Sequence, residues 1–233
     1  MLRRILSAAL AAGLLAGVLV SVLQAALTTP LILQAEVYEQ AMPAHGHGGG
    51  NQAQAHAHPA PSGTDWGEVA ARTGLTVAAN LVTGVGFALL VVAGFTLSGR
   101  AVEEREGLLW GLAGFAAFTL APALGLAPEV PGTYAADLAD RQAWWSFAAA
   151  GAAAALWLLA FGRAPWRFPV ALAVAALPHI LGAPEPAAFG GGVPPELAGQ
   201  FAARSIGVGA LFWCALGWLA GGFFRRLSPQ TGP

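Results

Sequence analysis

Lysine is absent from this 233-residue sequence, and charged residues of every kind make up only 10% of it. A soluble domain carries about 25% charged residues, which cover its surface in contact with water. Hydrophobic residues make up 56% of the chain, so charge is too scarce to cover a water-facing surface of this size. The composition therefore predicts an integral membrane protein. The formal net charge of −1 excludes the attraction to nucleic acid that a basic protein has.

Cysteine and enzyme motifs are scarce as well. Cys214 is the single cysteine, which excludes an internal disulfide and a zinc site built from several cysteines. It lies in the apolar run GALFWCALGW, where we expect a packed, unreactive thiol. The sequence has no glycine-rich phosphate loop, HExxH or Walker sequence, which are the motifs of phosphate-binding and zinc enzymes. We therefore expect neither an enzyme nor a prosthetic cofactor.

Long apolar runs are what the sequence has instead. A helix needs about 20 apolar residues to cross the hydrocarbon core of a bilayer. Six runs reach or approach that length: Ile5–Leu27, Leu75–Leu97, Gly107–Leu126, Ala143–Phe161, Phe168–Leu181 and Ala202–Phe224. The fifth is short and contains two prolines, so five crossings are the alternative. The predicted fold class is an all-α membrane protein, a polytopic bundle of six (or five) transmembrane helices forming one domain over residues 1–233.

The first apolar run resembles a signal peptide in one respect, since MLRR precedes it and LQA offers a cleavage site. Its apolar stretch is longer than the 7 to 15 residues of a signal-peptide core. We therefore interpret it as a retained transmembrane helix.

The arginines predict the topology. Cytoplasmic loops carry an excess of basic residues, and eight of the eleven arginines fall at the chain ends and in alternate connections between the predicted spans: Arg3, Arg4, Arg100, Arg105, Arg163, Arg167, Arg225 and Arg226. Six spans with both termini in the cytoplasm place all eight inside. The other three, Arg72, Arg141 and Arg204, then lie at the outer starts of spans.

The same topology places most acidic groups and all histidines on the outer side. These are nine of twelve carboxylates and five histidines: Glu36, Glu39, Asp65, Glu68, Glu129, Asp137, Asp140, Glu185, Glu196, His45, His47, His56, His58 and His179. Acidic residues obey no strong topology rule, so insertion alone does not explain this asymmetry. We interpret it as a surface that attracts divalent metal cations.

Four of the five histidines lie in HGHGGGNQAQAHAHP, residues 45–59, within a glycine- and alanine-rich segment. We expect residues 38–66 to form a disordered extracytoplasmic loop between the first two spans. Imidazole binds Co, Ni, Cu and Zn, and a flexible spacer can bring HGH and HAH together around one ion. Closing such a loop costs entropy, so we expect modest affinity that suits ion capture. A solvated loop without ligand function is the alternative.

Two spans share a proline pattern near their outer ends. Pro122 is followed six residues later by Pro128 and Glu129, and Pro178 by Pro184 and Glu185. A proline inside a helix leaves a carbonyl without its hydrogen bond. Beside His179, such a carbonyl predicts a ligand pair or a gate within the membrane. A histidine with its polar tip in water is the alternative.

Polar groups elsewhere in the spans receive structural interpretations. Asp137 and Arg141, four residues apart, are expected to pair on one helix, and Trp144 and Trp145 suit an outer aromatic belt. Asp137, Asp140 and Arg141 either anchor this helix or form a mouth that concentrates cations. Gln24, Asn80 and Thr83 are expected to join helices by hydrogen bonds, and the spacing of Gly13 and Gly17 predicts close helix packing.

Five segments taken in order give the chain a resemblance to a known family. They are MLRRILSAALAAGLLAGVLVSVLQ, PLILQAEVYE, LADRQAWW, LPHILGAPEP and VPPELAGQFAARS. Together they resemble the CbtA family, probable cobalt transporter subunits of bacteria, over nearly the whole length. The resemblance implies a multi-pass protein of the bacterial cytoplasmic (inner) membrane that takes up cobalt, often for cobalamin synthesis. It also implies a small single-span CbtB-like partner subunit.

The resemblance points to particular residues: Glu36, Asp137, Arg141, Trp144, Trp145, His179 and Pro184. The predicted function is therefore uptake of Co²⁺, with Ni²⁺ or Zn²⁺ as alternative cargoes. A membrane-anchored accessory protein, a sensor or chaperone that binds metal without moving it, is the alternative from another class. A transporter needs ligands inside the bundle, whereas an accessory protein needs only the exposed loop.

Overall fold

The computed structural model describes residues 2–41, 66–100, 102–188 and 190–227. Its elements are α1 (Leu2–Leu27), α2 (Thr29–Ala41), α3 (Trp66–Ser98), α4 (Glu104–Phe115), the π-helix η1 (Ala116–Leu120), α5 (Ala121–Ala123), α6 (Leu138–Phe161), α7 (Arg167–Leu181) and α8 (Pro195–Arg226). Extended pairing in the described residues is limited to one isolated bridge between Thr133 and Gly191. The predicted all-α fold is confirmed.

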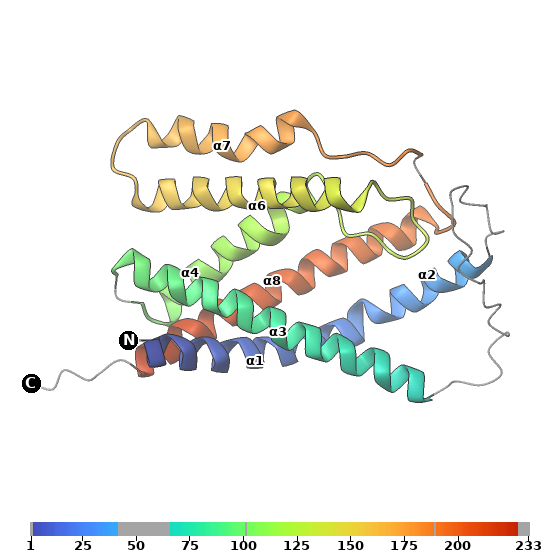
Figure 1. Ribbon diagram of the computed structural model, residues 1–233, viewed down its shortest axis with the longest axis horizontal. Helices are drawn as coiled ribbons and strands as arrows, with labels where there is room; N and C mark the ends of the chain where they lie inside the picture. Colours follow the sequence, from blue (N-terminus) through green and yellow to red (C-terminus); the bar gives the residue numbers. More distant parts are fainter. Residues whose placement is uncertain (1, 42–65, 101, 189, 228–233) are drawn as a thin grey trace, which may run out of the picture.

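Among the described residues, five helical segments are long and apolar enough to cross a bilayer: α1, α3, the continuous run α4–η1–α5, α6 and α8. They correspond to five of the six predicted spans. The remaining predicted span is α7, which has 15 residues and falls short of the usual 20 or so. It packs along α6 in the opposite direction (Figure 1). The described part of the chain therefore has five helical segments of full spanning length, while α7 is a shorter apolar helix that runs back along α6.

The two ends of the bundle differ in charge. The described chain termini and the α3–α4 and α6–α7 connections lie together at the left of Figure 1. These segments contain the eight arginines predicted to share one side, and we call this the arginine-rich end. The α2 helix and the α5–α6 and α7–α8 connections lie at the right. We call that the acidic end, because it carries Glu36, Glu39, Glu129, Asp137 and Glu185.

Glycines permit the closest helix contacts. A Cβ on Gly13 of α1 would lie 2.5 Å from Val85 Cα of α3, and one on Gly17 would lie 2.9 Å from the Asn80 carbonyl. Small residues allow backbones in a membrane to approach this closely and to pack by van der Waals contact. The close packing predicted from Gly13 and Gly17 is confirmed, with α3 as the partner helix.

The α4–α8 contact follows the same principle but was not predicted. A Cβ on Gly217 of α8 would lie 2.7 Å from Gly111 Cα of α4, and one on Gly221 would lie 3.0 Å from Gly107 Cα. Gly107 and Gly111 are four residues apart on α4, and Gly217 and Gly221 are four residues apart on α8. The glycines therefore line one stripe of each helix. These four glycines lock α4 and α8 together, and neither helix accepts a side chain there.

A buried core joins α1, α3 and α8 toward the arginine-rich end. Ala12, Val92, Phe95, Leu216 and Phe224 are among its buried members. At its edge Arg4 of α1 donates from Nε to the Phe224 carbonyl of α8 (2.9 Å) and its guanidinium lies 3.6 Å from the centroid of the Phe224 ring. The first and last described helices are therefore tied directly to each other.

The two predicted proline interruptions differ in structure. Before Pro122 the chain forms η1, in which the Ala121 N–H reaches back five residues to the Ala116 carbonyl. The wider π-helical turn accommodates the proline ring, which would otherwise meet the carbonyl four residues earlier. At Pro178 the α-helix continues without a π-helical turn. The equivalent carbonyl, that of Val174, lies 3.0 Å from where a Cβ on Gly151 of α6 would be, so it is packed against α6.

Helix α2 was not expected. It begins two residues after α1 ends and covers Thr29–Ala41, so residues 38–41, assigned to the predicted loop, are helical. Leu31 and Ala35 pack with Val130, Val193 and Leu197 in a second small core. The rest of that loop up to residue 65, with His45, His47, His56 and His58, lies outside the described residues.

Candidate functional site

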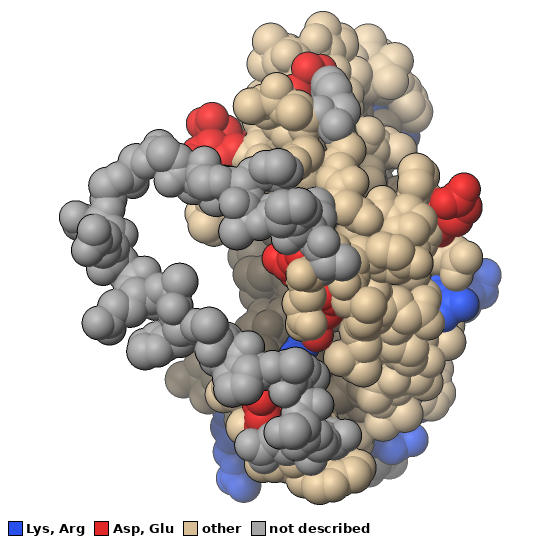
Figure 2. All heavy atoms as spheres, turned by 90° about the vertical axis from the view of Figure 1, so that its right-hand side faces the viewer, with Lys and Arg blue, Asp and Glu red and all other residues tan. Residues whose placement is uncertain are grey.

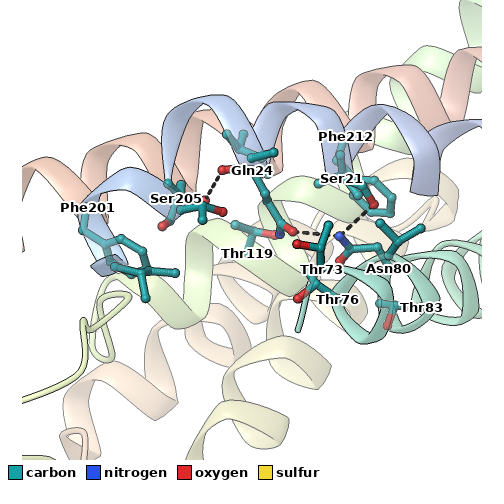
Figure 3. Close-up of a pocket in the computed structure, with 18 of the residues that line it drawn as sticks. Ser21, Gln24, Thr73, Thr76, Asn80, Thr83, Thr119, Phe201, Ser205 and Phe212 are labelled. Carbon is teal, nitrogen blue, oxygen red and sulfur yellow. Dashed lines mark hydrogen bonds between the residues drawn. The ribbon is translucent and has the colours of Figure 1, made fainter. Parts of the chain in front are cut away.

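A cavity of about 690 Å³ lies among α1, α2, α3, η1 and α8, with Trp145 of α6 at its side. We call it the central cavity. Figure 3 shows its polar side chains, which come from several helices: Ser21, Gln24, Thr73, Thr76, Asn80, Thr83, Thr119 and Ser205. Ser21, Gln24 and Asn80 point toward one another. Its lining starts near the acidic end of α3 and α8 and reaches the middle of both helices. The arrangement suits small polar cargo within an otherwise apolar bundle.

Asn80 organises the polar wall. Its Nδ2 donates to Ser21 Oγ (3.0 Å) and to Gln24 Oε1 (2.7 Å) on the facing helix (Figure 3). Ser21 Oγ in turn donates to the Gly17 carbonyl (2.8 Å). Gln24 and Asn80 therefore join α1 to α3 as predicted, while Thr83 lines the cavity.

Aromatic rings form the floor of the central cavity. Phe118 stacks on Trp213 with centroids 5.6 Å apart, and Phe87 lies 4.7 Å from Trp213 and 5.4 Å from Phe118. Trp213 is only 2% exposed. Beyond these rings, toward the arginine-rich end, the buried core of α1, α3 and α8 follows. The cavity is thus closed on that side by packed side chains.

An ion pair lies at the other edge of the central cavity. Arg72 of α3 lines the cavity and donates to both carboxylate oxygens of Glu36 on α2, at 2.5 and 3.4 Å. The neighbouring lining residues Leu33 and Val69 are 50% and 44% exposed. Glu36, one of the residues to which the family resemblance pointed, is therefore placed at the cavity edge, where it links α2 to α3.

A second cavity of about 620 Å³ adjoins the first between α5 and α6, and the two share Phe118, Thr119 and Trp145. Pro122, Glu129 and Arg141 also line it. Arg141 pairs with Glu129 (3.0 Å), whereas the sequence predicted a pair with Asp137. Asp137 instead caps α6, because its Oδ1 accepts from the Ala139 and Asp140 backbone N–H groups. Such a cap satisfies donors that a helix start leaves free.

His179 lies on α7, away from the central cavity. Its ring meets that of buried Trp144 edge to face with centroids 5.6 Å apart. Trp144 Nε1 donates to the Pro178 carbonyl (3.2 Å), so His179 and Pro178 both contact the same indole. Asp140, Trp144 and Pro184 line a shallow hollow beside them, and the exposed Glu185 follows Pro184 in the chain.

The predicted metal ligands do not gather in the described part of the chain. No three His, Cys, Asp or Glu side chains there are grouped closely enough to hold a metal ion. Figure 2, which faces the acidic end, shows carboxylates at separate places on the surface. Glu129 is engaged with Arg141 and Asp137 with the start of α6. The metal-binding role of His179, Asp140 and Glu185 stays a prediction.

The central cavity was not predicted from the sequence, because the polar residues of the first two spans were interpreted only as helix–helix contacts. Thr73, Thr76, Asn80 and Thr83 recur at intervals of three and four residues, which places them on one face of a helix. Ser21 and Gln24 in the first span and Thr28 just after it show the same spacing. Polar stripes on two apolar helices predict a polar space between them once the two helices are known to be neighbours, and that neighbourhood comes from the fold.

The fold and the cavity define a polytopic helical membrane protein with a cavity between its spans that is lined in part by polar side chains. The chain matches the family model described as probable cobalt transporter subunit (CbtA) over residues 2–225. It therefore belongs to the CbtA family, as the sequence resemblance indicated. No curated protein and no solved structure matches the chain.

Proposed function

We propose that this chain is the membrane subunit that carries Co²⁺ inward, receiving the ion at the acidic end and passing it through the central cavity. The observation that carries the proposal is the central cavity itself, a cavity among the spans of a CbtA-family protein where a cluster of neutral polar side chains interrupts an apolar lining. A polar lining at membrane depth is costly and is a hypothesis of function by default.

The shape of the cavity supports entry from the acidic end. Packed rings and the buried core lie on its arginine-rich side, while exposed residues and the Glu36–Arg72 pair lie on the other. In this proposal the arginine-rich end is cytoplasmic, following the positive-inside rule. The acidic end then faces outward and raises the local concentration of cations. In this proposal the four histidines between residues 45 and 58 help to capture the cobalt ion on that outer side.

The proposal includes a second subunit, and it has a competing function. The word subunit in the family description supports a partner, and we propose a small single-span CbtB-like protein. An accessory protein that binds metal without moving it is the competing function. It is favoured by the absence of a three-ligand group among the described residues. Nickel or zinc is the competing cargo.

Uptake of radioactive cobalt separates these functions. Cells without their own cobalt uptake would express this chain with and without the small partner. The proposal expects ion accumulation inside the cells, whereas an accessory protein would hold cobalt at the membrane without accumulation. Excess nickel or zinc in the same assay identifies the preferred cargo.

Two cavity variants link uptake to the central cavity. Asn80→Leu removes the centre of the polar wall, and Ser205→Ala removes a cavity hydroxyl outside the Asn80 network. Both should lower uptake with the protein still present in the membrane. Gln200→Leu is the matched control, because Gln200 is an exposed amide on α8 outside the cavity lining. Equal uptake by all three variants would contradict a route through this cavity.

A further inference from the structure

The described lining of the central cavity has no group that usually coordinates cobalt directly. Imidazole, thiolate and carboxylate are the common protein ligands of such metals, and none of the described lining residues carries one. Arg72 is the charged lining residue, and it is engaged with Glu36. Apart from Arg72, the hydrogen-bonding aliphatic side chains that line the cavity are neutral hydroxyls and amides.

Three of these hydroxyls, those of Ser21, Thr28 and Thr76, are left as acceptors. A hydroxyl has one proton to donate and two lone pairs. Ser21 donates its proton to the Gly17 carbonyl (2.8 Å), Thr28 to the Gln24 carbonyl (3.2 Å) and Thr76 to the Arg72 carbonyl (2.9 Å). Each hydroxyl thus donates its one proton to the backbone carbonyl four residues earlier in the chain. What each oxygen still offers is the capacity to accept a hydrogen bond.

Asn80 adds a further acceptor. Because Ser21 Oγ has given its proton to Gly17, only a donor fits opposite it, which places the Asn80 Nδ2 there (3.0 Å). The second Nδ2 proton is donated to Gln24 Oε1 (2.7 Å). Both donors of the amide are thus used, and Oδ1 is the Asn80 atom that can still accept.

A wall of neutral acceptors suits a cargo that presents donors. Water bound to a divalent cation is such a donor, since the ion polarises its O–H bonds. Six waters occupy roughly 180 Å³ at about 30 Å³ each, so a cavity of about 690 Å³ admits the ion with its whole first shell.

We propose that the central cavity binds the divalent cation as its intact hydrated complex, through hydrogen bonds from metal-bound water to Ser21, Thr28, Thr76 and Asn80. No protein atom enters the first coordination shell there. This inference rests on the proposed function, because it takes the cavity as part of the cobalt route. It explains how the ion enters an apolar bundle without losing its water and without a carboxylate or imidazole at that depth.

Hexaamminecobalt(III) is the probe. It has the octahedral shape and outward-pointing donors of the hydrated ion, and it does not exchange its ligands for protein groups. The full-length chain would be placed in nanodiscs of phosphatidylcholine, with His45, His47, His56 and His58 changed to Asn. Binding of the complex is measured by equilibrium dialysis and cobalt analysis, and its inhibition of radioactive Co²⁺ uptake is measured in proteoliposomes.

Thr76→Val removes one proposed acceptor while keeping the shape of the side chain. Thr96→Val is the matched control, because Thr96 lies on the same helix and also donates to the backbone, to the Ala93 carbonyl (2.7 Å), but lies outside the described cavity lining. Losing one acceptor should weaken hexaammine binding about fivefold, and Thr96→Val should leave it unchanged. Thermal unfolding of both variants checks that they fold.

The possible outcomes separate this inference from the proposed function. Binding that depends on Thr76 and not on Thr96 supports the hydrated complex, even if no uptake is found. Cobalt uptake that a hundredfold excess of hexaammine leaves unchanged, in chain that folds normally, overturns the inference and leaves the transport function standing. Equal binding by the two threonine variants also overturns it, since the complex is then held elsewhere.

Discussion

The indole of Trp213 donates its N–H to Thr119 Oγ1 at 3.0 Å, and this bond joins α8 to the π-helix η1 beneath the central cavity. It fixes the largest ring of the cavity floor. Thr119→Val should leave the nearly buried indole donor without its partner and destabilise the protein by about 1 to 2 kcal/mol. Thermal unfolding in detergent measures this. Thr83→Val, a cavity threonine outside this bond, should cost less, and an equal loss would contradict a special role for Thr119.

The α4–α8 contact allows a test with a matched control on one helix. Gly217→Ala would place a methyl 2.7 Å from Gly111 Cα, whereas Gly207→Ala meets nothing within 4 Å. The first variant should lose about 1 to 3 kcal/mol of stability through overpacking. The second should be neutral or slightly stabilising, since alanine favours helix over glycine. Unfolding temperatures that fall equally would show that this close approach does not limit stability.

Topology can be tested by labelling. With Cys214 replaced by Ser, a single cysteine at Ala53 should react with a membrane-impermeant thiol reagent in intact cells. A cysteine at Arg163, in the α6–α7 connection at the arginine-rich end, should react only after the cells are opened. The reverse pattern would place the arginine-rich end outside and contradict the proposed direction of transport.

The histidines at residues 45–58 should matter when metal is scarce. Changing His45, His47, His56 and His58 to Asn should lower cobalt uptake at low external cobalt and leave it near normal at high cobalt. The reason is that a capture segment raises local concentration without forming the path. Uptake measured across a range of cobalt concentrations distinguishes the two effects. Loss at every concentration would make these histidines part of the path.

His179→Ala should lower uptake capacity at all cobalt concentrations if this imidazole is a ligand or gate. The structure adds a second explanation, because the ring also packs against Trp144. His179→Phe keeps an aromatic ring in that place without a ligand nitrogen. Low uptake by both variants indicates a ligand, and recovery in the phenylalanine variant indicates packing. Normal uptake by both would remove His179 from the route.

The sequence was informative where one residue type controls the outcome. The eight arginines predicted which connections share an end, and Gly13 and Gly17 predicted a close helix contact. These signals are local, since insertion depends on charge beside each span and close packing on missing side chains. The family was likewise accessible, because its motifs extend over most of the chain.

Relationships between distant residues were harder to predict. Arg141 has two acids within reach of its side chain, and spacing favoured Asp137, whereas the fold brings Glu129 to it. The proline pattern suggested two similar interruptions, but only the one at Pro122 has a π-helical turn before it. The cavity required knowing that the polar faces of α1 and α3 meet at Asn80. Each depends on which helices become neighbours, which periodicity alone does not determine.

The contact between Arg4 and Phe224 has a consequence for synthesis. The partner of the first helix at this position is made 220 residues later, and the buried core needs α1, α3 and α8 together. While the ribosome is still making the middle of the protein, the small-residue face of α1 can meet α3 but not α8. The nascent bundle therefore stays open along one side until α8 leaves the insertion machinery. This core therefore closes in the membrane only when α8 packs against α1.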